Sequence, residues 1–258
     1  MTLSSPLAYY LCVGLAILVL GISKTGFGGG IGILSIPLMA MVMPAQRMVA
    51  VLAIILVVVD LFSNVHYLGE WDWGVLKWLL PGAVAGVGVG CLVLLAMQRS
   101  NPGRFDKNLS LAIGLICMAV VAMQMVRMVG KNLPTPRSGP VSGAAVGVVA
   151  GAVSTISHSS GPIVSLYLLQ ERVEKRKLVG TMLLYTLLIN SVKLILFVAL
   201  LRTVDGGTFR ATAWMIPLLP VGTVAGVWMN KRIPQRPFVI IMYVAAAVTA
   251  VQMIWKGL

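Results

Sequence analysis

Charged residues are scarce in this sequence, and acidic residues are the scarcest. Charged side chains make up 10% of the 258 residues, and Asp and Glu number 7 against 20 Lys and Arg. Hydrophobic residues reach 59% and the mean hydropathy is +0.96, well above the values of soluble globular domains. This composition excludes a water-soluble globular chain and predicts an integral protein of the lipid bilayer.

The net charge of +13 does not indicate a nucleic-acid-binding face. Nearly all Lys and Arg residues stand in short segments between apolar runs, where basic residues set the orientation of a membrane protein. We therefore expect no nucleic-acid partner.

Cysteine is rare, and the motifs that bind metals or ATP are missing. Cys12, Cys91 and Cys117 are isolated within apolar segments, with no CxxC pair and no Cys/His cluster. No P-loop of the form GxxxxGKS or GxxxxGKT is present. These absences exclude a thiol-disulfide carrier and an ATP-driven pump, and we expect neither a metal nor a cofactor.

Long apolar runs are what the sequence does contain. A bilayer core is about 30 Å thick and takes roughly 20 helical residues per crossing, so the chain has room for roughly eight to ten transmembrane or half-membrane helices. The predicted fold class is an all-α integral membrane protein. The apolar runs lie at about 7–22, 31–43, 47–66, 74–97, 105–128, 140–156, 162–170, 176–201, 211–230 and 236–255.

The order of these runs repeats, which predicts two homologous halves. Three stretches of the first half recur in the same order in the second, and unrelated halves would rarely agree in this way. We expect a first repeat over 1–129, a Pro- and Gly-rich linker over 130–140 and a second repeat over 141–258. The matching stretches are 21–39 with 151–169, 82–87 with 222–227, and 122–125 with 250–253.

Two arrangements of the halves remain open. Inverted halves have ten segments, whereas parallel halves have eight crossings in which each pair of short segments makes one broken span. The distribution of basic residues does not choose between them. We favour inverted repeats, which place Lys131 and Arg137 on the cytoplasmic side and both termini outside.

A glycine run interrupts the first pair of short segments. Glycine costs roughly 1 kcal/mol per residue in a helix interior, so the run Gly26-Phe-Gly-Gly-Gly30 predicts a broken helix. Irregular backbone at membrane depth must be buried in protein or line a wet cavity, and such breaks at matching positions of two repeats indicate a transporter site. The candidate substrate-binding residues here are Lys24, Thr25, Gly28, Gly29 and Gly30.

The second break carries hydroxyl groups and a histidine. Free amides at a helix start, with several donor side chains, suit an anion that has several acceptor oxygens. The alternative is that these serines only cap helices, and that Lys24 only extends toward the headgroups. The candidate substrate-binding residues here are Ser157, His158, Ser159, Ser160 and Gly161.

Two charged residues lie deep within apolar runs. Asp60 and Lys193 each cost at least ~2.5 kcal/mol at the bilayer centre, so each must pair or face water. When the repeats are aligned, Asp60 matches Asn190, and Lys193 follows one helical turn later. We expect Asp60, Asn64, Asn190 and Lys193 to converge, either as a coupling site or as an ion pair that locks the halves together.

The stretch GISKTGFGGGIGILSIPLM, its counterpart ending in GPIVSLYLL and the duplicated layout resemble the TauE/SafE family of sulfite and organosulfonate exporters. The resemblance covers essentially the whole chain. It implies a multi-pass carrier of the bacterial inner membrane for sulfur-containing oxyanions or related carboxylates. The residues themselves indicate a small oxyanion.

The leading hypothesis is a secondary transporter, not an enzyme, that exports a small anion by alternating access. Protons that move through His158 or Asp60 are candidate coupling ions, and Lys24→Gln is expected to weaken anion binding by about 1.5–3 kcal/mol in a folded protein. The alternatives are an intramembrane hydrolase, whose adjacent Ser and His rarely form a nucleophile–base pair, and a non-transporting scaffold. The sequence does not indicate an oligomeric state.

Overall fold

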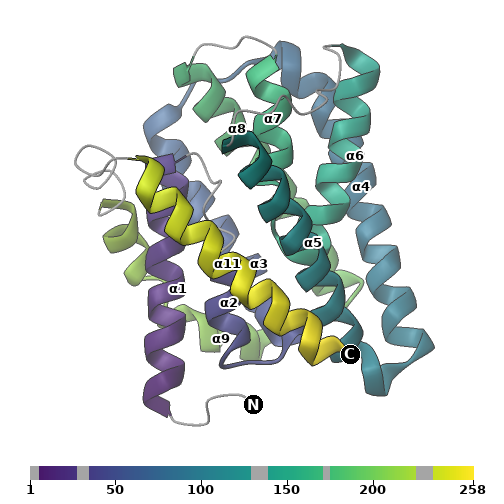
Figure 1. Cartoon of the computed structure of the whole chain (residues 1–258). Helices are drawn as coiled ribbons and strands as arrows, with labels where there is room; N and C mark the ends of the chain where they lie inside the picture. The colour runs from purple at the N-terminus through teal and green to yellow at the C-terminus, as the bar shows by residue number, and fades with distance from the viewer. Residues whose placement is uncertain (1–5, 28–34, 129–138, 171–174, 225–234) are drawn as a thin grey trace.

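The computed structural model describes residues 6–27, 35–128, 139–170, 175–224 and 235–258, and the regular elements among them are all helical (Figure 1). The predicted all-α class is confirmed. The α-helices are α1 (Pro6–Phe27), α2 (Ser35–Ala40), α3 (Ala45–Asn64), α4 (Trp73–Ser100), α5 (Phe105–Met128), α6 (Pro140–Ser157), α7 (Gly161–Gln170), α8 (Lys175–Ala199), α9 (Gly206–Ala213) and α11 (Gln235–Gly257). Two short 3₁₀ turns, Val65–Tyr67 and Pro102–Arg104, join helices, and residues 218–224 are also helical.

Several of these helices are long and apolar enough to cross a bilayer, so the protein is a multi-pass membrane protein. Among the described residues, α3, α4, α5, α6 and α8 meet both conditions. The span of α3 is 67% buried inside the protein, against 39–44% for the other four. Helix α3 is therefore the most deeply buried span in this set.

Glycines bring α4 and α6 into close parallel contact. A Cβ added to Gly82 or Gly86 would collide with the backbone of α6, and one added to Gly147 or Gly151 would collide with the backbone of α4. Small residues four apart let helix backbones approach in lipid, where packing drives association. Gly82 and Gly86 are therefore helix-packing residues.

The same kind of contact recurs between α1 and residues 218–224. A Cβ added to Gly21 would lie 2.7 Å from the backbone of Gly222, and one added to Gly222 would lie 2.9 Å from the carbonyl oxygen of Leu18. In the aligned repeats Gly21 matches Gly151, and residues 222–227 match 82–87. The contact of α1 with residues 218–224 therefore corresponds to the contact of α6 with α4.

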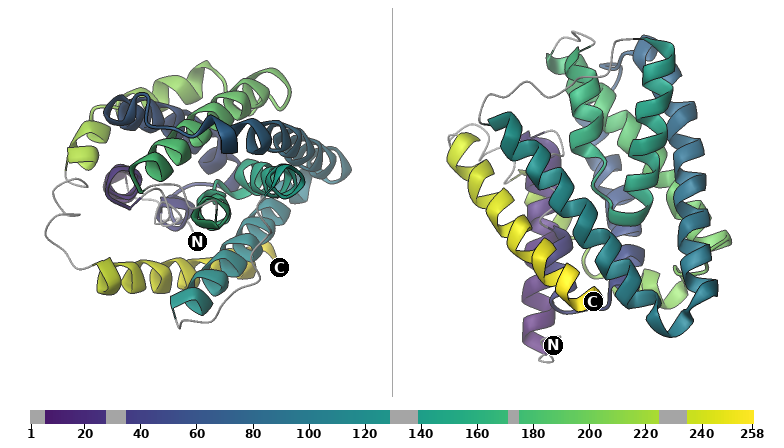
Figure 2. Two further views of the ribbon diagram at one scale, coloured as in Figure 1. Left: turned by 90° about the horizontal axis from the view of Figure 1, so that it is seen from above. Right: turned by 45° about the vertical axis from the view of Figure 1, so that its right-hand side comes forward.

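Two other helix pairs run antiparallel. In α3 and α8, Asn64 lies against Leu183 while Asp60 lies against Asn190. In the pair of α5 and α11, which Figure 2 shows tilted across the outside of the molecule, Gly114 faces Ala250 and Ile254. Each pair joins corresponding helices of the two predicted repeats, and inverted repeats require such helices to run in opposite directions. Lys131 and Arg137 lie outside the described residues.

The predicted break in the second half is present, but the chain turns back after it. α6 ends at Ser157, His158 adopts the left-handed conformation with φ 52°, and α7 begins at Gly161. The Tyr167 hydroxyl donates to the Gly139 carbonyl oxygen at 3.3 Å, so α7 returns to the start of α6. These helices form a hairpin, and the alternative of one broken span is wrong for this pair.

In the first half, α1 continues further than predicted. Gly26 and Phe27 are still helical, because a single glycine costs only about 1 kcal/mol, which the other residues of a long helix offset. The rest of the glycine run, Gly28 to Gly30, lies outside the described residues.

Candidate functional site

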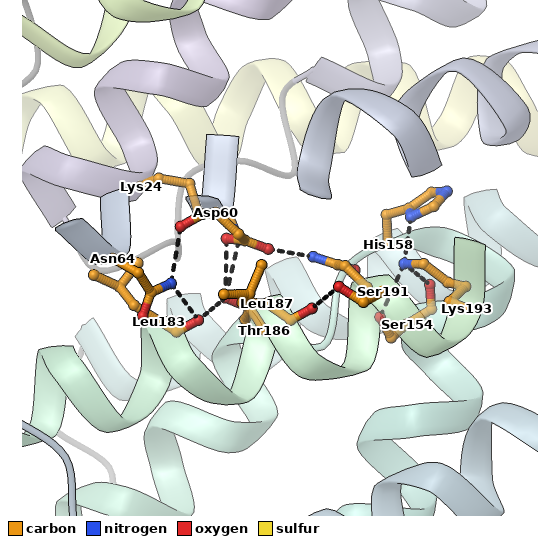
Figure 3. Close-up of polar contacts among 11 residues, drawn as sticks. Lys24, Asp60, Asn64, Ser154, His158, Leu183, Thr186, Leu187, Ser191 and Lys193 are labelled. Carbon is orange, nitrogen blue, oxygen red and sulfur yellow. Dashed lines mark hydrogen bonds and ion pairs between the residues drawn. The ribbon is translucent and has the colours of Figure 1, made fainter. Parts of the chain in front are cut away.

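Three charged side chains are buried among the described residues, and all three lie in one region of the protein. Lys24 is 6% exposed, and Asp60 and Lys193 are fully buried. They come from α1, α3 and α8, and Figure 3 shows two polar clusters side by side along α8, one around Asp60 and one around Lys193. Buried charges in a membrane protein are functional candidates by default.

The first cluster surrounds the carboxylate of Asp60. The Lys24 ammonium forms an ion pair with Oδ1, the Thr186 hydroxyl donates to Oδ1 at 3.0 Å, and the Asn190 amide donates to Oδ2 at 2.6 Å. The structure thus brings Asp60 and Asn190 together, as the aligned repeats predicted. Both carboxylate oxygens are therefore bonded, and one of them forms the ion pair.

Asn64 lies next to this cluster but serves helix packing. Its amide group donates to the Asp60 carbonyl oxygen at 2.8 Å and to the Leu183 carbonyl oxygen at 3.0 Å. These bonds tie the end of α3 to α8. Asn64 therefore positions Asp60 and does not line the cavity described below.

The second cluster surrounds Lys193. Its ammonium lies 2.7 Å from His158 Nδ1 and donates to the Ser154 carbonyl and hydroxyl oxygens at 3.2 and 3.3 Å. The Ser154 carbonyl oxygen also accepts the backbone N–H of His158, so Lys193 is a second donor to it in the last turn of α6. The Asp60–Lys193 pair considered from the sequence is wrong: one turn past Asn190, Lys193 reaches α6, and Lys24 pairs with the carboxylate.

His158 connects the hairpin tip to both neighbouring helices. Its Nδ1 faces the Lys193 ammonium, and its Nε2 lies 3.1 Å from the Val49 carbonyl oxygen. Since an ammonium only donates, Nδ1 is the acceptor, and we infer that Nε2 carries the hydrogen that bonds Val49. The imidazole is then neutral, and these bonds hold a non-glycine residue in a left-handed conformation.

A small cavity of about 40 Å³ lies beside the two clusters. This volume is enough for a water molecule or a small ion. Polar and apolar side chains both line it. Six predicted site residues are on its wall: Lys24, His158, Ser159, Ser160, Gly161 and Asn190.

The start of α7 forms one side of this cavity. The Ser160 carbonyl oxygen accepts hydrogen bonds from the backbone N–H groups of Ile163 and Val164, and Gly161 and Pro162 open the helix and line the cavity. Proline suits the first turn because its fixed φ is already helical. A helix N-terminus carries partial positive charge, which favours an anion in the cavity.

The sequence did not single out Tyr185 and Thr186, although both line the cavity. Tyr185 is fully buried, and its hydroxyl has no hydrogen-bond partner among the described residues. A buried hydroxyl without a partner is costly, so it is a donor available to a ligand. Thr186 could have been identified from its spacing to Asn190 and Lys193, which places the three residues along one side of α8.

The other predicted residues do not reach the described cavity wall or cannot be placed. Ser157 is buried, donates to the Val153 carbonyl oxygen and contacts the Ser159 hydroxyl. The side chain of Thr25 and the residues Gly28, Gly29 and Gly30 lie outside the described part of the chain, so their role as binding residues stays a prediction.

These features define a multi-pass helical membrane protein with a buried cationic site at the tip of a hairpin, an arrangement typical of membrane carriers. The family described as Sulfite exporter TauE/SafE matches residues 13–253, so the chain belongs to this family of membrane transporters. No curated protein and no solved structure matches the chain.

Proposed function

We propose that this protein is a secondary transporter that exports a small oxyanion across the bacterial inner membrane by alternating access. Sulfite, organosulfonates and related carboxylates are the substrates that its family and its site chemistry favour. The observation that carries the proposal is the excess of buried positive charge beside one small cavity. Lys24 lines the cavity, while Asp60 and Lys193 lie behind its wall and bond residues that line it.

The two lysines differ in what balances their charge. The ammonium of Lys24 is paired with Asp60, whereas the hydrogen-bond acceptors of Lys193 are the neutral Ser154 and His158. A buried charge without an opposite charge is strongly unfavourable. An anion in the cavity would supply the missing charge, while the Tyr185 hydroxyl and the start of α7 would supply hydrogen-bond donors.

The proposed mechanism uses the two repeats, 1–129 and 141–258, joined by the linker over 130–140. The site lies where helices from both halves meet, because Asp60 of the first half bonds Asn190 of the second. Rocking of one half against the other would then expose the cavity to alternate sides of the membrane. The antiparallel packing of α3 against α8 supports the inverted arrangement that this motion needs.

Flux through proteoliposomes tests the transport function. Purified protein should give saturable efflux of labelled sulfite or methanesulfonate, and Lys193→Gln, which keeps a hydrogen-bond donor, should reduce it at least about tenfold. Lys107→Gln is the matched control, since Lys107 is an exposed residue outside the site and its loss should leave the flux unchanged. Absence of flux for sulfite, methanesulfonate and acetate alike would favour the scaffold alternative.

Proton coupling through His158 is a second expected result. Burial and, after it, the Lys193 ammonium disfavour an additional proton on neutral His158, and a bound anion would offset the repulsion from the ammonium. An anion and a proton would therefore load together, and a pH step across the vesicles should drive anion flux. His158→Gln should abolish this drive while anion exchange persists.

Asp60, the other proton carrier considered from the sequence, is bonded through both carboxylate oxygens to Lys24, Thr186 and Asn190. If a pH step drives anion flux through His158→Gln as strongly as through the unaltered protein, His158 does not take part in proton coupling.

The hydrolase alternative is disfavoured by the contacts of His158. A general base must lie within hydrogen-bond distance of the serine hydroxyl whose proton it takes. The His158 ring nitrogens bond Lys193 and Val49 instead. The neighbouring hydroxyls of Ser157 and Ser159 bond each other instead.

A further inference from the structure

The buried charges of the site sum to a single positive charge. Lys24 and Lys193 each contribute one positive charge, Asp60 contributes one negative charge, and His158 is neutral in the tautomer that its contacts define. These are the charged side chains that are buried among the described residues, so no other buried charge in this part of the chain changes the sum.

We propose that the site is matched to a monovalent oxyanion and that Asp60 is the residue that selects against divalent anions. This inference rests on the proposed function, because it concerns the same cavity. A monovalent anion, such as a sulfonate or the hydrogensulfite form of sulfite, brings the site to neutrality. A divalent anion leaves one negative charge unbalanced in a buried site, where charges are poorly screened.

Asp60 is placed to enforce this selection. Three residues that line the cavity bond its carboxylate: Lys24, Thr186 and Asn190. The carboxylate therefore lies directly behind the cavity wall, and its bonds prevent it from turning away. The second negative charge of a dianion would face this fixed carboxylate, and repulsion between like charges disfavours binding.

Sulfate and methanesulfonate test the proposal, because they are tetrahedral sulfur oxyanions of similar size that differ by one charge. Their dissociation constants are to be measured by calorimetry on the purified full-length protein near pH 6, where sulfate is a dianion, methanesulfonate is a monoanion and lysine ammonium groups are protonated. We expect methanesulfonate to bind at least about tenfold more tightly than sulfate.

Two variants separate charge from shape. Asp60→Asn raises the charge of the site to two positive charges. The ratio of the dissociation constants of sulfate and methanesulfonate should then shift at least about tenfold in favour of sulfate. Lys24→Gln combined with Asp60→Asn restores a single positive charge, and the preference for methanesulfonate should return. The same two ligands are compared in the unaltered protein and both variants. Any contribution of the methyl group of methanesulfonate therefore cancels from the change in the ratio of the two dissociation constants.

Each outcome has a defined meaning. Sulfate binding as tightly as methanesulfonate to the unaltered protein would overturn the proposal, and this comparison needs no variant to fold. An unchanged ratio in folded Asp60→Asn would overturn it equally. If the unaltered protein binds neither sulfate nor methanesulfonate, and carries neither of them nor sulfite, the proposed transport function fails, which differs from a failure of charge selection.

Discussion

Lys24→Gln is expected to destabilise the protein by about 3–5 kcal/mol, the range for breaking a buried ion pair from one side. The substitution leaves the carboxylate of Asp60 without an opposite charge, although Asp60 is fully buried. The sequence alone had predicted weaker anion binding in a stably folded variant. The structure changes this expectation because it shows which carboxylate Lys24 neutralises.

The double variant Lys24→Gln with Asp60→Asn is the matched control. It removes both charges and leaves amide groups that can bond Thr186 and Asn190, so it should recover most of the lost stability. Unfolding in detergent, followed by intrinsic fluorescence across a denaturant series, gives the free energies of unfolding of the parent, the single variant and the double variant. If Lys24→Gln alone were as stable as the double variant, the ion pair would not stabilise the fold.

Gly86→Ala is expected to destabilise the protein by about 1–3 kcal/mol or more, the cost of overpacking a tight contact. The added methyl group would collide with the Val148 carbonyl group in the backbone of α6. Backbone atoms cannot move aside as a flexible side chain can, so α4 and α6 would have to separate along their length. We expect a lower unfolding temperature and less folded protein in the membrane.

Gly88→Ala, two residues further along the same helix, is the control for this prediction. A Cβ at Gly88 meets no atom within 4 Å. Because alanine favours a helix by about 1 kcal/mol over glycine, this variant should be as stable as the parent or more so. Equal unfolding temperatures for the two variants would show that the close contact of α4 with α6 does not limit stability.

Several helices could be predicted closely from the sequence because apolar runs and their interruptions are local properties, whereas the run at 211–230 is divided by a turn at 214–217 and α9 already begins at Gly206. The run at 105–128 corresponds to α5, and the run at 162–170 corresponds to α7 within one residue. The return of α7 toward the start of α6 could not be predicted, since a helix break does not specify the direction of the chain after it. That direction depends on the contact between Tyr167 and Gly139.

The candidate site was predicted in part. The meeting of Asp60 and Asn190 followed from the repeat, because residues near a twofold axis lie close to their own equivalents. The partner of each lysine could not be derived in this way, because Lys24 and Lys193 have no charged equivalents in the other half: the aligned positions are Ser154 and Ser63. Tyr185 was missed because an aromatic residue in an apolar helix gives no sign of an unpaired hydroxyl.

The central claim is that an anion binds at the tip of the α6–α7 hairpin, and crystals grown with perrhenate test it most directly. Perrhenate is a monovalent tetrahedral oxyanion whose heavy atom is located by anomalous diffraction. The account predicts a rhenium peak in the cavity bounded by Lys24, Ser160 and Asn190. A peak found only elsewhere, as in the 380 Å³ hollow beside Lys107 and Lys256, would contradict it.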